Sequence, residues 1–140
     1  GTSARLKEMT SSITEEKAER KQADHWSIKE QIGHLSDLED LHEGRIDDFL
    51  AHKEILRPAD PKNAATNNDH HNQSSFTELI DRFSKKRNVF ILRLSQLSDE
   101  IHEVKAIHPR LQVPMRPVDM AYFTAEHDDH HLTSIRELMS

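Results

Sequence analysis

Apolar residues recur every three or four positions along two long stretches of this chain, which is the spacing of one buried face of an α-helix. In the first stretch, residues 27–52, they are Ile28, Ile32, Leu35, Leu38, Ile46 and Phe49. In the second, residues 75–97, they are Phe76, Phe83, Phe90 and Leu97, with Ile80, Ile91 and Leu94 beside them. Each stretch opens with Ser-x-x-Glu, the capping-box pattern of a helix start. We therefore predict a long helix over each stretch.

Weaker stripes occupy the two ends of the chain. Residues 4–21 place Leu6, Met9, Ile13 and Ala18 roughly on one side. Residues 117–139 place Phe123, Ile135 and Leu138 on one face, and they begin with Pro117. Proline is favoured in the first turn of a helix because its missing N–H has no partner there in any case. These segments are predicted to form the first and fourth helices.

Two connections separate the predicted helices. Residues 55–74 carry Pro58, Pro61 and several Asn but almost no apolar residue, so they are expected to form a loop. Loops longer than ~12–15 residues are commonly crossovers, lids or disordered stretches, and a crossover suits a bundle whose helices do not all alternate in direction. Residues 98–116 contain His108-Pro109 and Val113-Pro114, which exclude one regular helix.

The composition favours an all-α fold. Only 34% of the 140 residues are hydrophobic and 31% are charged, so the apolar residues must gather on particular faces, as helices allow. Glycine (3) and proline (5) are too scarce for a succession of short strands and turns. We predict a single domain, residues 1–140, folded as a four-helix bundle with a long crossover connection.

The charge and apolar content also limit the partners. A net charge of −6 disfavours nucleic acid. The one compact basic run, Lys85-Lys86-Arg87, is interpreted as the solvated face of a helix. No apolar run approaches the ~20 residues that span a bilayer, and the N-terminus lacks the apolar region of a signal peptide. We expect a soluble, cytoplasmic protein with no membrane partner.

The absence of cysteine means that any metal site must use nitrogen and oxygen ligands. Among the 11 histidines, His127 and His131 lie one helical turn apart on the face that continues through Ile135 and Leu138. Two imidazoles so placed can chelate one metal ion. A polar helix surface is the alternative, but two buried imidazoles side by side need a shared partner to offset their desolvation.

A third candidate ligand, His34, lies beside the apolar stripe of residues 27–52. It follows Gly33, which costs ~1 kcal/mol in a helix relative to alanine and therefore indicates the close approach of another element. Taken alone, a histidine in this position is more simply interpreted as a hydrogen-bonded core residue. Its metal-binding interpretation depends on the other two histidines.

These motifs carry a family resemblance. Trp26-Ser27-Ile28-Lys29-Glu30 followed by Gly33-His34-Leu35, together with His127-Asp128-Asp129-His130-His131 on the last helix, resembles the DinB/YfiT-like superfamily. The resemblance implies a four-helix bundle and a site in which three histidines hold one divalent metal ion, commonly zinc, nickel or iron. Carried over by position, the ligands are His34, His127 and His131. A pair at positions 127 and 130 is the alternative, and the apolar continuation of the face favours His131.

Three imidazoles leave coordination positions open, as in catalytic metal sites. Asp37, Glu126 and Asp128 are close enough in sequence to accept hydrogen bonds from the imidazoles or to accept a proton, although each is more simply a solvated surface charge. The resemblance points to enzymes that use low-molecular-weight thiols for transfer or isomerisation, and to hydrolases. It implies a small-molecule substrate and makes a homodimer plausible.

Two other functions remain open at the level of sequence. The chain could be a non-catalytic, metal-binding stress-response bundle, or its histidines could form a metal-free, pH-sensitive cluster. A cavity that opens onto the metal site would favour catalysis. For His70-His71, a disordered polar loop is favoured over a lid that approaches the site.

Overall fold

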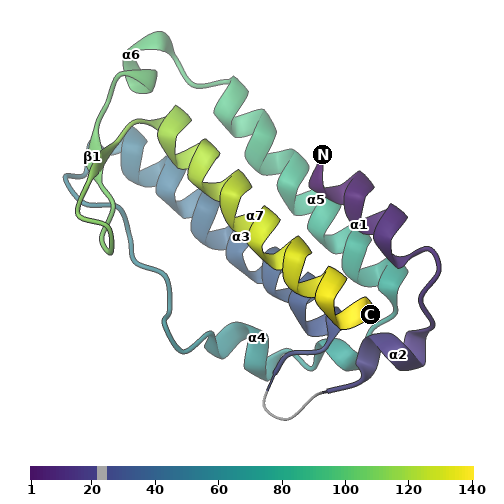
Figure 1. Cartoon of the computed structure of the whole chain (residues 1–140). Coiled ribbons are helices and arrows are strands. Elements are labelled where there is room, and N and C mark those ends of the chain that lie inside the picture. Colours follow the sequence, from purple (N-terminus) through teal and green to yellow (C-terminus); the bar gives the residue numbers. More distant parts are fainter. Residues whose placement is uncertain (22–24) are drawn as a thin grey trace.

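The computed structural model describes residues 1–21 and 25–140 and is mostly helical (Figure 1). Its elements are α1 (Thr2–Thr10), α2 (Glu15–Glu19), α3 (Ile28–Leu50), α4 (Ala64–Asn68), the 3₁₀ helix η1 (His71–Gln73), α5 (Phe76–Ser95), α6 (Asp99–His102), β1 (Ala106–Ile107), β2 (Pro114–Met115) and α7 (Pro117–Met139). Four of these helices, α1, α3, α5 and α7, make the bundle, which confirms the predicted fold class.

The direction of the helices explains the long connection. Helix α3 contacts both α5 and α7, and α1 packs against α5 and α7 on the other side. Figure 1 shows that α3 and α5 run in the same direction, whereas α1 and α7 run opposite to them. Because α3 and α5 are parallel neighbours, the chain between them must return along the length of the bundle. Residues 51–75 make this predicted crossover.

Both long central helices begin where the capping boxes predict. The Ser27 hydroxyl accepts from the Glu30 amide while the Glu30 carboxylate accepts from the Ser27 amide, and Ser75 and Glu78 repeat the arrangement in α5. Pro117 lies in the first turn of α7, as expected. These starts depend on contacts between residues three apart, so a sequence alone can locate them.

Three details differ from the sequence-based predictions. Residues 4–21 do not form one helix: α1 ends at Thr10, and the Thr14 hydroxyl accepts from the Lys17 amide to start α2. The crossover is not wholly irregular, because it contains α4 and η1. Ile91 is 54% exposed although it lies beside the α5 stripe, because it directly follows the buried Phe90 and one residue turns an α-helix by about 100°.

The buried apolar residues form two separate clusters. One joins α1, α2, α3, α5 and α7 around residues such as Leu35, Phe83 and Ile135. The other lies near the opposite end of α3, around Phe49 and Met120. Between them α3 buries polar and charged side chains, including Glu39, His42 and Arg45. The middle of the bundle is therefore polar.

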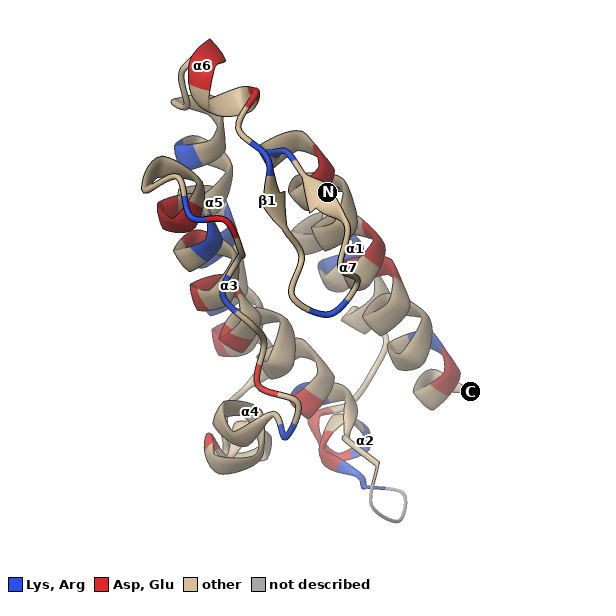
Figure 2. Cartoon of the chain, turned by 90° about the vertical axis from the view of Figure 1, so that its left-hand side faces the viewer, with Lys and Arg blue, Asp and Glu red and all other residues tan. Residues whose placement is uncertain are grey.

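One side of the bundle is covered by chain that is not part of the four helices. Strands β1 and β2 form a short antiparallel hairpin, and Ile55 from the crossover bridges to Ile107 of β1. Figure 2 shows the segment after α3 and this hairpin running down the same side of the bundle. Among the residues described, no helix is long and apolar enough to cross a membrane.

Candidate metal centre

Three histidines from two helices converge in the polar middle of the bundle. His34 comes from α3, and His127 and His131 come one turn apart from α7. One ring nitrogen of each lies within 4.8 Å of the others. His34 and His131 are buried and His127 is half-buried. The structure thus brings together the three residues that the sequence analysis selected as ligands.

The ring orientation of His34 is set by a relay from the crossover. Thr66 of α4 donates its hydroxyl proton to Asp37 Oδ2 at 2.7 Å, and His34 Nδ1 lies 3.0 Å from the same hydroxyl oxygen. Because the Thr66 proton is committed to Asp37, the hydroxyl must accept from His34, which places the imidazole proton on Nδ1. The Nε2 lone pair of His34 is therefore free for a ligand.

His131 is oriented in a similar way. Its Nδ1 lies 2.6 Å from the Gln31 side-chain oxygen, which can only accept, so its Nε2 is also unprotonated. The ring of Trp26 covers the pair, with its centroid 4.5 Å from that of His34 and 6.4 Å from that of His131. Trp26 is held in turn by a hydrogen bond from Nε1 to Asn67.

The site favours neutral imidazoles. Burial, together with the charge of His127, lowers the pKa of His34 from 6.5 to about 4. Burial and the neighbouring histidines lower the pKa of His131 to about 3, and burial also lowers the pKa of His127. Neutral imidazole is the form that donates a lone pair to a metal, so the cluster is ready to bind a cation at neutral pH.

The spacing of the nitrogens fits a metal ion. His127 Nε2 and His131 Nε2 lie 3.2 Å apart. Two ligands at the usual Zn–N length of ~2.0–2.1 Å in a tetrahedral arrangement have nitrogens about 3.3 Å apart. Without a metal, the same two atoms can only share one proton, and His127 Nδ1 is buried without a partner in the part of the chain that the structure describes. The residues present fit a divalent cation.

The other residues that the sequence analysis considered for this site differ in their distance from the three histidines. His130 is exposed and is not part of the three-histidine group, and Glu126 is also exposed. Asp37 reaches His34 through Thr66, as described above, and although burial raises its pKa, hydrogen bonds from His71 and Thr66 lower it overall. Asp128 does not contact a histidine ring through a hydrogen bond. It is buried on another face of α7.

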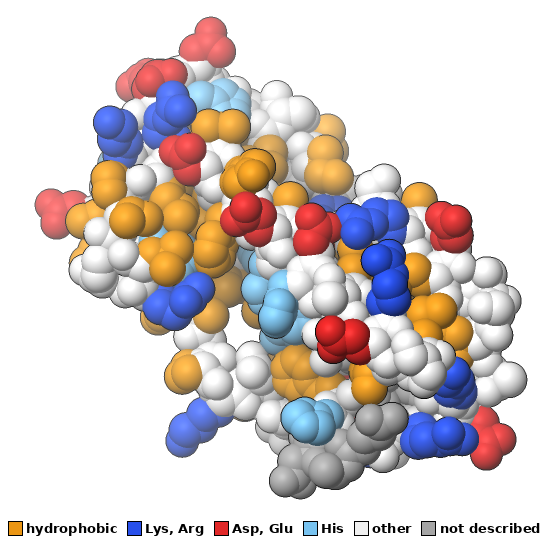
Figure 3. All heavy atoms as spheres, viewed as in Figure 1, with side chains coloured by type: hydrophobic (Ala, Val, Ile, Leu, Met, Phe, Trp, Pro, Cys, Tyr) orange, Lys and Arg blue, Asp and Glu red, His pale blue; other side chains and the backbone are white. Residues whose placement is uncertain are grey.

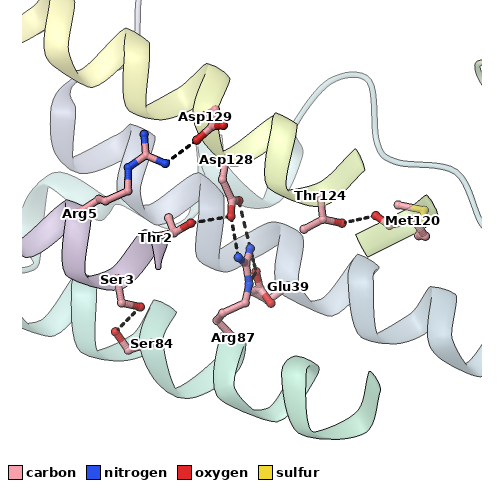
Figure 4. A network of polar contacts seen from close by, with 10 residues as sticks. All are labelled: Thr2, Ser3, Arg5, Glu39, Ser84, Arg87, Met120, Thr124, Asp128 and Asp129. Carbon is pink, nitrogen blue, oxygen red and sulfur yellow. Dashed lines mark hydrogen bonds and ion pairs between the residues drawn. The ribbon is translucent and has the colours of Figure 1, made fainter. Parts of the chain in front are cut away.

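Asp128 belongs to an ion cluster with Arg87 and Glu39, shown in Figure 4. Arg87 Nη1 lies 2.6 Å from Asp128 Oδ2 and Arg87 Nη2 lies 2.6 Å from Glu39 Oε1. Thr2 of α1 also donates to Asp128 at 2.9 Å. The interpretations of Arg87 as part of a solvated basic face and of Asp128 as a solvated charge or a histidine acceptor were wrong. Arg87 instead joins α3, α5 and α7 from within the bundle.

The interpretation of His71 as part of a disordered polar loop was also wrong. Its side chain is 1% exposed, and its Nε2 lies 2.9 Å from Asp37 Oδ2. A Cβ atom on Gly33 would lie 2.2 Å from the His71 ring. Gly33 therefore marks the close approach that its presence in a helix suggested, and the approaching element is η1. His71 fixes Asp37 instead of covering the site as a lid.

A cavity of about 490 Å³ reaches His127, one of the three histidines. His127 lines it, together with residues of α3, the crossover, the hairpin and α7 that include Leu41, His42, Arg45 and Phe123. In Figure 3 histidine side chains reach the surface next to a hollow in the middle of the molecule. His42 and His108, for which the sequence supported no function, both line this cavity.

Comparisons with known proteins agree with this architecture. A family model described as the DinB superfamily matches residues 1–135. YfiT from Bacillus subtilis, described as a probable metal-dependent hydrolase with an unusual four-helix bundle topology, superposes with a TM-score of 0.75 at 20% identity, covering 98% of this chain and 79% of that one. A mycothiol-dependent maleylpyruvate isomerase superposes with a TM-score of 0.74 at 7% identity, covering 96% of this chain and 56% of that one.

At these identities the two solved structures are similar to this chain in fold alone, and this chain spans just over half the length of the isomerase. No curated protein is similar in sequence. The family model extends over nearly the whole chain, including Ser27, His34 and the histidines of α7. The chain therefore belongs to the DinB superfamily.

Proposed function

We propose that this protein is a metal-dependent enzyme that holds one divalent metal ion, zinc, nickel or iron, through His34, His127 and His131. The convergence of three neutral imidazoles supports it, as does the orientation of two of them by Thr66 and Gln31. When bound, such an ion supplies Lewis-acid chemistry toward a water, a thiol or a carbonyl group. The protein contributes the fixed ring orientations and the partly buried surroundings of the site.

The observation that carries the catalytic proposal is the cavity. A structural metal is usually closed by four protein ligands, whereas the described residues offer three in this group. The cavity of about 490 Å³ reaches one of those three, His127. A small-molecule substrate is therefore the proposed partner. A non-catalytic stress-response bundle would need no such space beside its metal.

The reaction class is proposed from two sources. The isomerase that shares this fold is mycothiol-dependent by its description, and YfiT is described as a probable hydrolase. The family resemblance points to both classes, and we place transfer or isomerisation with a low-molecular-weight thiol ahead of hydrolysis. A cytoplasmic location and a homodimer remain predictions, and the second is tested by sedimentation of the untagged protein.

Elemental analysis tests the metal site. Untagged wild type should carry about one equivalent of metal, as should His130→Ala, while His127→Ala should carry none. His130 is the matched control because it is a neighbouring but exposed histidine on the same helix. Absence of stoichiometric metal from the wild type, even after reconstitution with zinc, nickel or iron, would contradict the proposal.

Turnover tests the catalytic part separately. The metal-loaded wild type should convert a member of a panel of thiol-transfer and hydrolase substrates, and His127→Ala should not. A protein that binds metal with the expected stoichiometry but turns over neither class would support the non-catalytic bundle.

A further inference from the structure

The cavity that reaches His127 has an unusual charge balance. Two arginines, Arg45 and Arg110, line it, but no Asp or Glu among the described residues does, in a chain with 25 acidic residues. Besides His127, two histidines line the cavity, His42 and His108. Both are buried, and burial lowers the pKa of each. At neutral pH the charge of the lining is therefore positive, although the protein as a whole is negative.

Arg45 is a buried cation. Among the described residues, no carboxylate forms an ion pair with it. It is 3% exposed. Its Nε donates to the Arg57 carbonyl at 3.0 Å, and its Nη1 lies 3.9 Å from the Met120 sulfur, a weak acceptor. The nearby Asp48 carboxylate is engaged by Arg57, whose Nε and Nη2 donate to it at 3.1 and 3.0 Å. A buried charge in this state is costly unless a ligand completes its hydrogen bonds.

Arg110 brings a second positive charge to the same cavity from the hairpin. It is exposed and forms no ion pair in the described part of the chain. The turn that carries it is fixed, because His108 Nδ1 accepts from the backbone amides of Arg110 and Leu111 at 3.2 and 3.1 Å. Burial lowers the pKa of Arg45. The charge of Asp48 opposes this effect in part, and the charge of Arg110 adds to it.

The rest of the lining is largely apolar. Leu38 and Leu41 of α3, Phe123 of α7 and Pro58 of the crossover contribute to it, and His127 lies at the same cavity. Pockets of this kind bind an organic body through apolar contacts and orient it through a few polar groups. Arginine is the side chain best suited to bind a carboxylate with two hydrogen bonds.

We propose that the cavity binds a carboxylate-bearing organic molecule, with its carboxylate at Arg45 and Arg110 and its apolar body against Leu38, Leu41 and Phe123. The proposal names the substrate class of the function proposed above and rests on it for the reaction, since the same cavity reaches His127. Binding of the carboxylate itself requires the arginines and not the metal.

A matched pair of probes tests this inference. 3-Phenylpropanoate and its neutral amide, 3-phenylpropanamide, are titrated by NMR into the full chain, both metal-loaded and chelator-treated. The acid should bind at least ~10-fold more tightly than the amide in both states, because the charged hydrogen bonds are lost with the amide. Inorganic phosphate, which lacks an apolar body, should not displace the acid at equal concentration.

Variants assign the effect to the two arginines. Arg110→Gln, at an exposed position, should weaken binding of the acid ~10-fold and leave the amide unchanged. Arg45→Met should also weaken binding of the acid ~10-fold, and a circular dichroism spectrum like that of the wild type shows that this variant is folded. Arg136→Gln is the control, because Arg136 is exposed on α7 and does not line the cavity.

Three results would overturn the inference. They are equal binding of acid and amide, wild-type affinity for the acid in Arg110→Gln, and loss of acid binding on chelation, which would place the carboxylate on the metal instead. Arginine-dependent binding in a protein that takes up no metal would contradict the proposed function alone. Stoichiometric metal without arginine-dependent binding would contradict only this inference.

Discussion

His127 and Asp128 are neighbours in the sequence but belong to two polar clusters of opposite character. Asp128 lies in the ion cluster, which we define as Arg87, Glu39 and Asp128. His127 lies in the histidine cluster with His34 and His131. Both clusters occupy the polar middle of the bundle, and one step along α7 turns the side chain from one to the other.

The clusters differ in how far their side chains are hydrogen-bonded to one another. In the ion cluster the Arg87 guanidinium donates to both carboxylates, and Thr2 adds a donor to Asp128. Of the four carboxylate oxygens, Glu39 Oε2 alone has no hydrogen-bond partner among the described residues. In the histidine cluster the outer nitrogens of His34 and His131 are satisfied while the inner ones face each other. Charged groups that are hydrogen-bonded to one another indicate a structural role. Ring nitrogens whose lone pairs converge without a hydrogen-bond donor indicate a binding site.

The largest expected effect is the loss of Arg87. Arg87→Met leaves Glu39 and Asp128 buried without their cation, and removing one partner of a buried ion pair costs about 3–5 kcal/mol. The free energy of unfolding, measured in urea, should fall by this amount whether metal is present or chelated. Lys85→Met, at an exposed position of the same helix, should change it by less than ~0.5 kcal/mol. A loss confined to the metal-loaded protein would contradict a structural role for the ion cluster.

Metal removal should affect the histidine cluster alone. A metal that binds only the folded protein adds about 2.7 kcal/mol to the free energy of unfolding when its free concentration is 100 times its Kd. Chelation should therefore lower the thermal midpoint of the wild type and of His130→Ala. It should not alter that of His127→Ala. An unchanged wild type would instead support a metal-free histidine cluster.

The relay from Thr66 should tune the metal site without supporting the fold. Thr66→Val removes the hydroxyl that accepts from His34, and such a loss typically weakens metal affinity about 10- to 100-fold. Competition with a chromophoric chelator measures it. Thr124→Val is the control, since Thr124 is equally buried but donates to the Met120 carbonyl near the ion cluster. Equal affinities in the two variants would mean that His34 needs no orienting partner.

The smallest effect is a change in the pH dependence of stability. Burial, assisted by the charges of Arg87 and other neighbours, lowers the pKa of His42 from 6.5 to about 3. In the unfolded chain His42 takes up a proton as the pH falls below 6.5, but in the folded protein it does not until about pH 3. Stability is therefore complete above pH 6.5 and falls progressively below it.

His42→Leu should remove this contribution. In chelated protein the wild type should lose stability between pH 6.5 and 5 faster than the variant, by at most about 1.4 kcal/mol per pH unit, the value for one proton. Urea unfolding at several pH values measures both slopes. Equal slopes would show that His42 titrates alike in the folded and unfolded chain.

The helices were predictable because their signals are local. The capping boxes at Ser27 and Ser75 join residues three apart, and the apolar stripes need only the helical period. The break between α1 and α2 also had a local signal that was overlooked, because Thr14 followed by Glu15 and Glu16 is a typical helix start. That signal was masked by an apolar spacing that continued across it.

The partners of the polar residues were not predictable in the same way. Arg87 meets Glu39 and Asp128, which lie 48 and 41 residues away. Thr66 meets His34 because the crossover runs back along α3 at that level. A basic run and a polar loop look the same in sequence whether they face solvent or a buried partner. For this reason the ion cluster and the relay were missed, as was the role of His71.

The sequence by itself determined the long helices α3, α5 and α7 and the need for a crossover, because periodicity and capping depend on nearby residues. The three histidines that meet in the bundle were predicted from motifs shared with a family. Only the tertiary structure decided which face each polar side chain occupies, what holds each imidazole in its tautomer, and that two arginines share a cavity with His127. Those features depend on burial and on contacts between distant segments, and both exist only once the helices have packed.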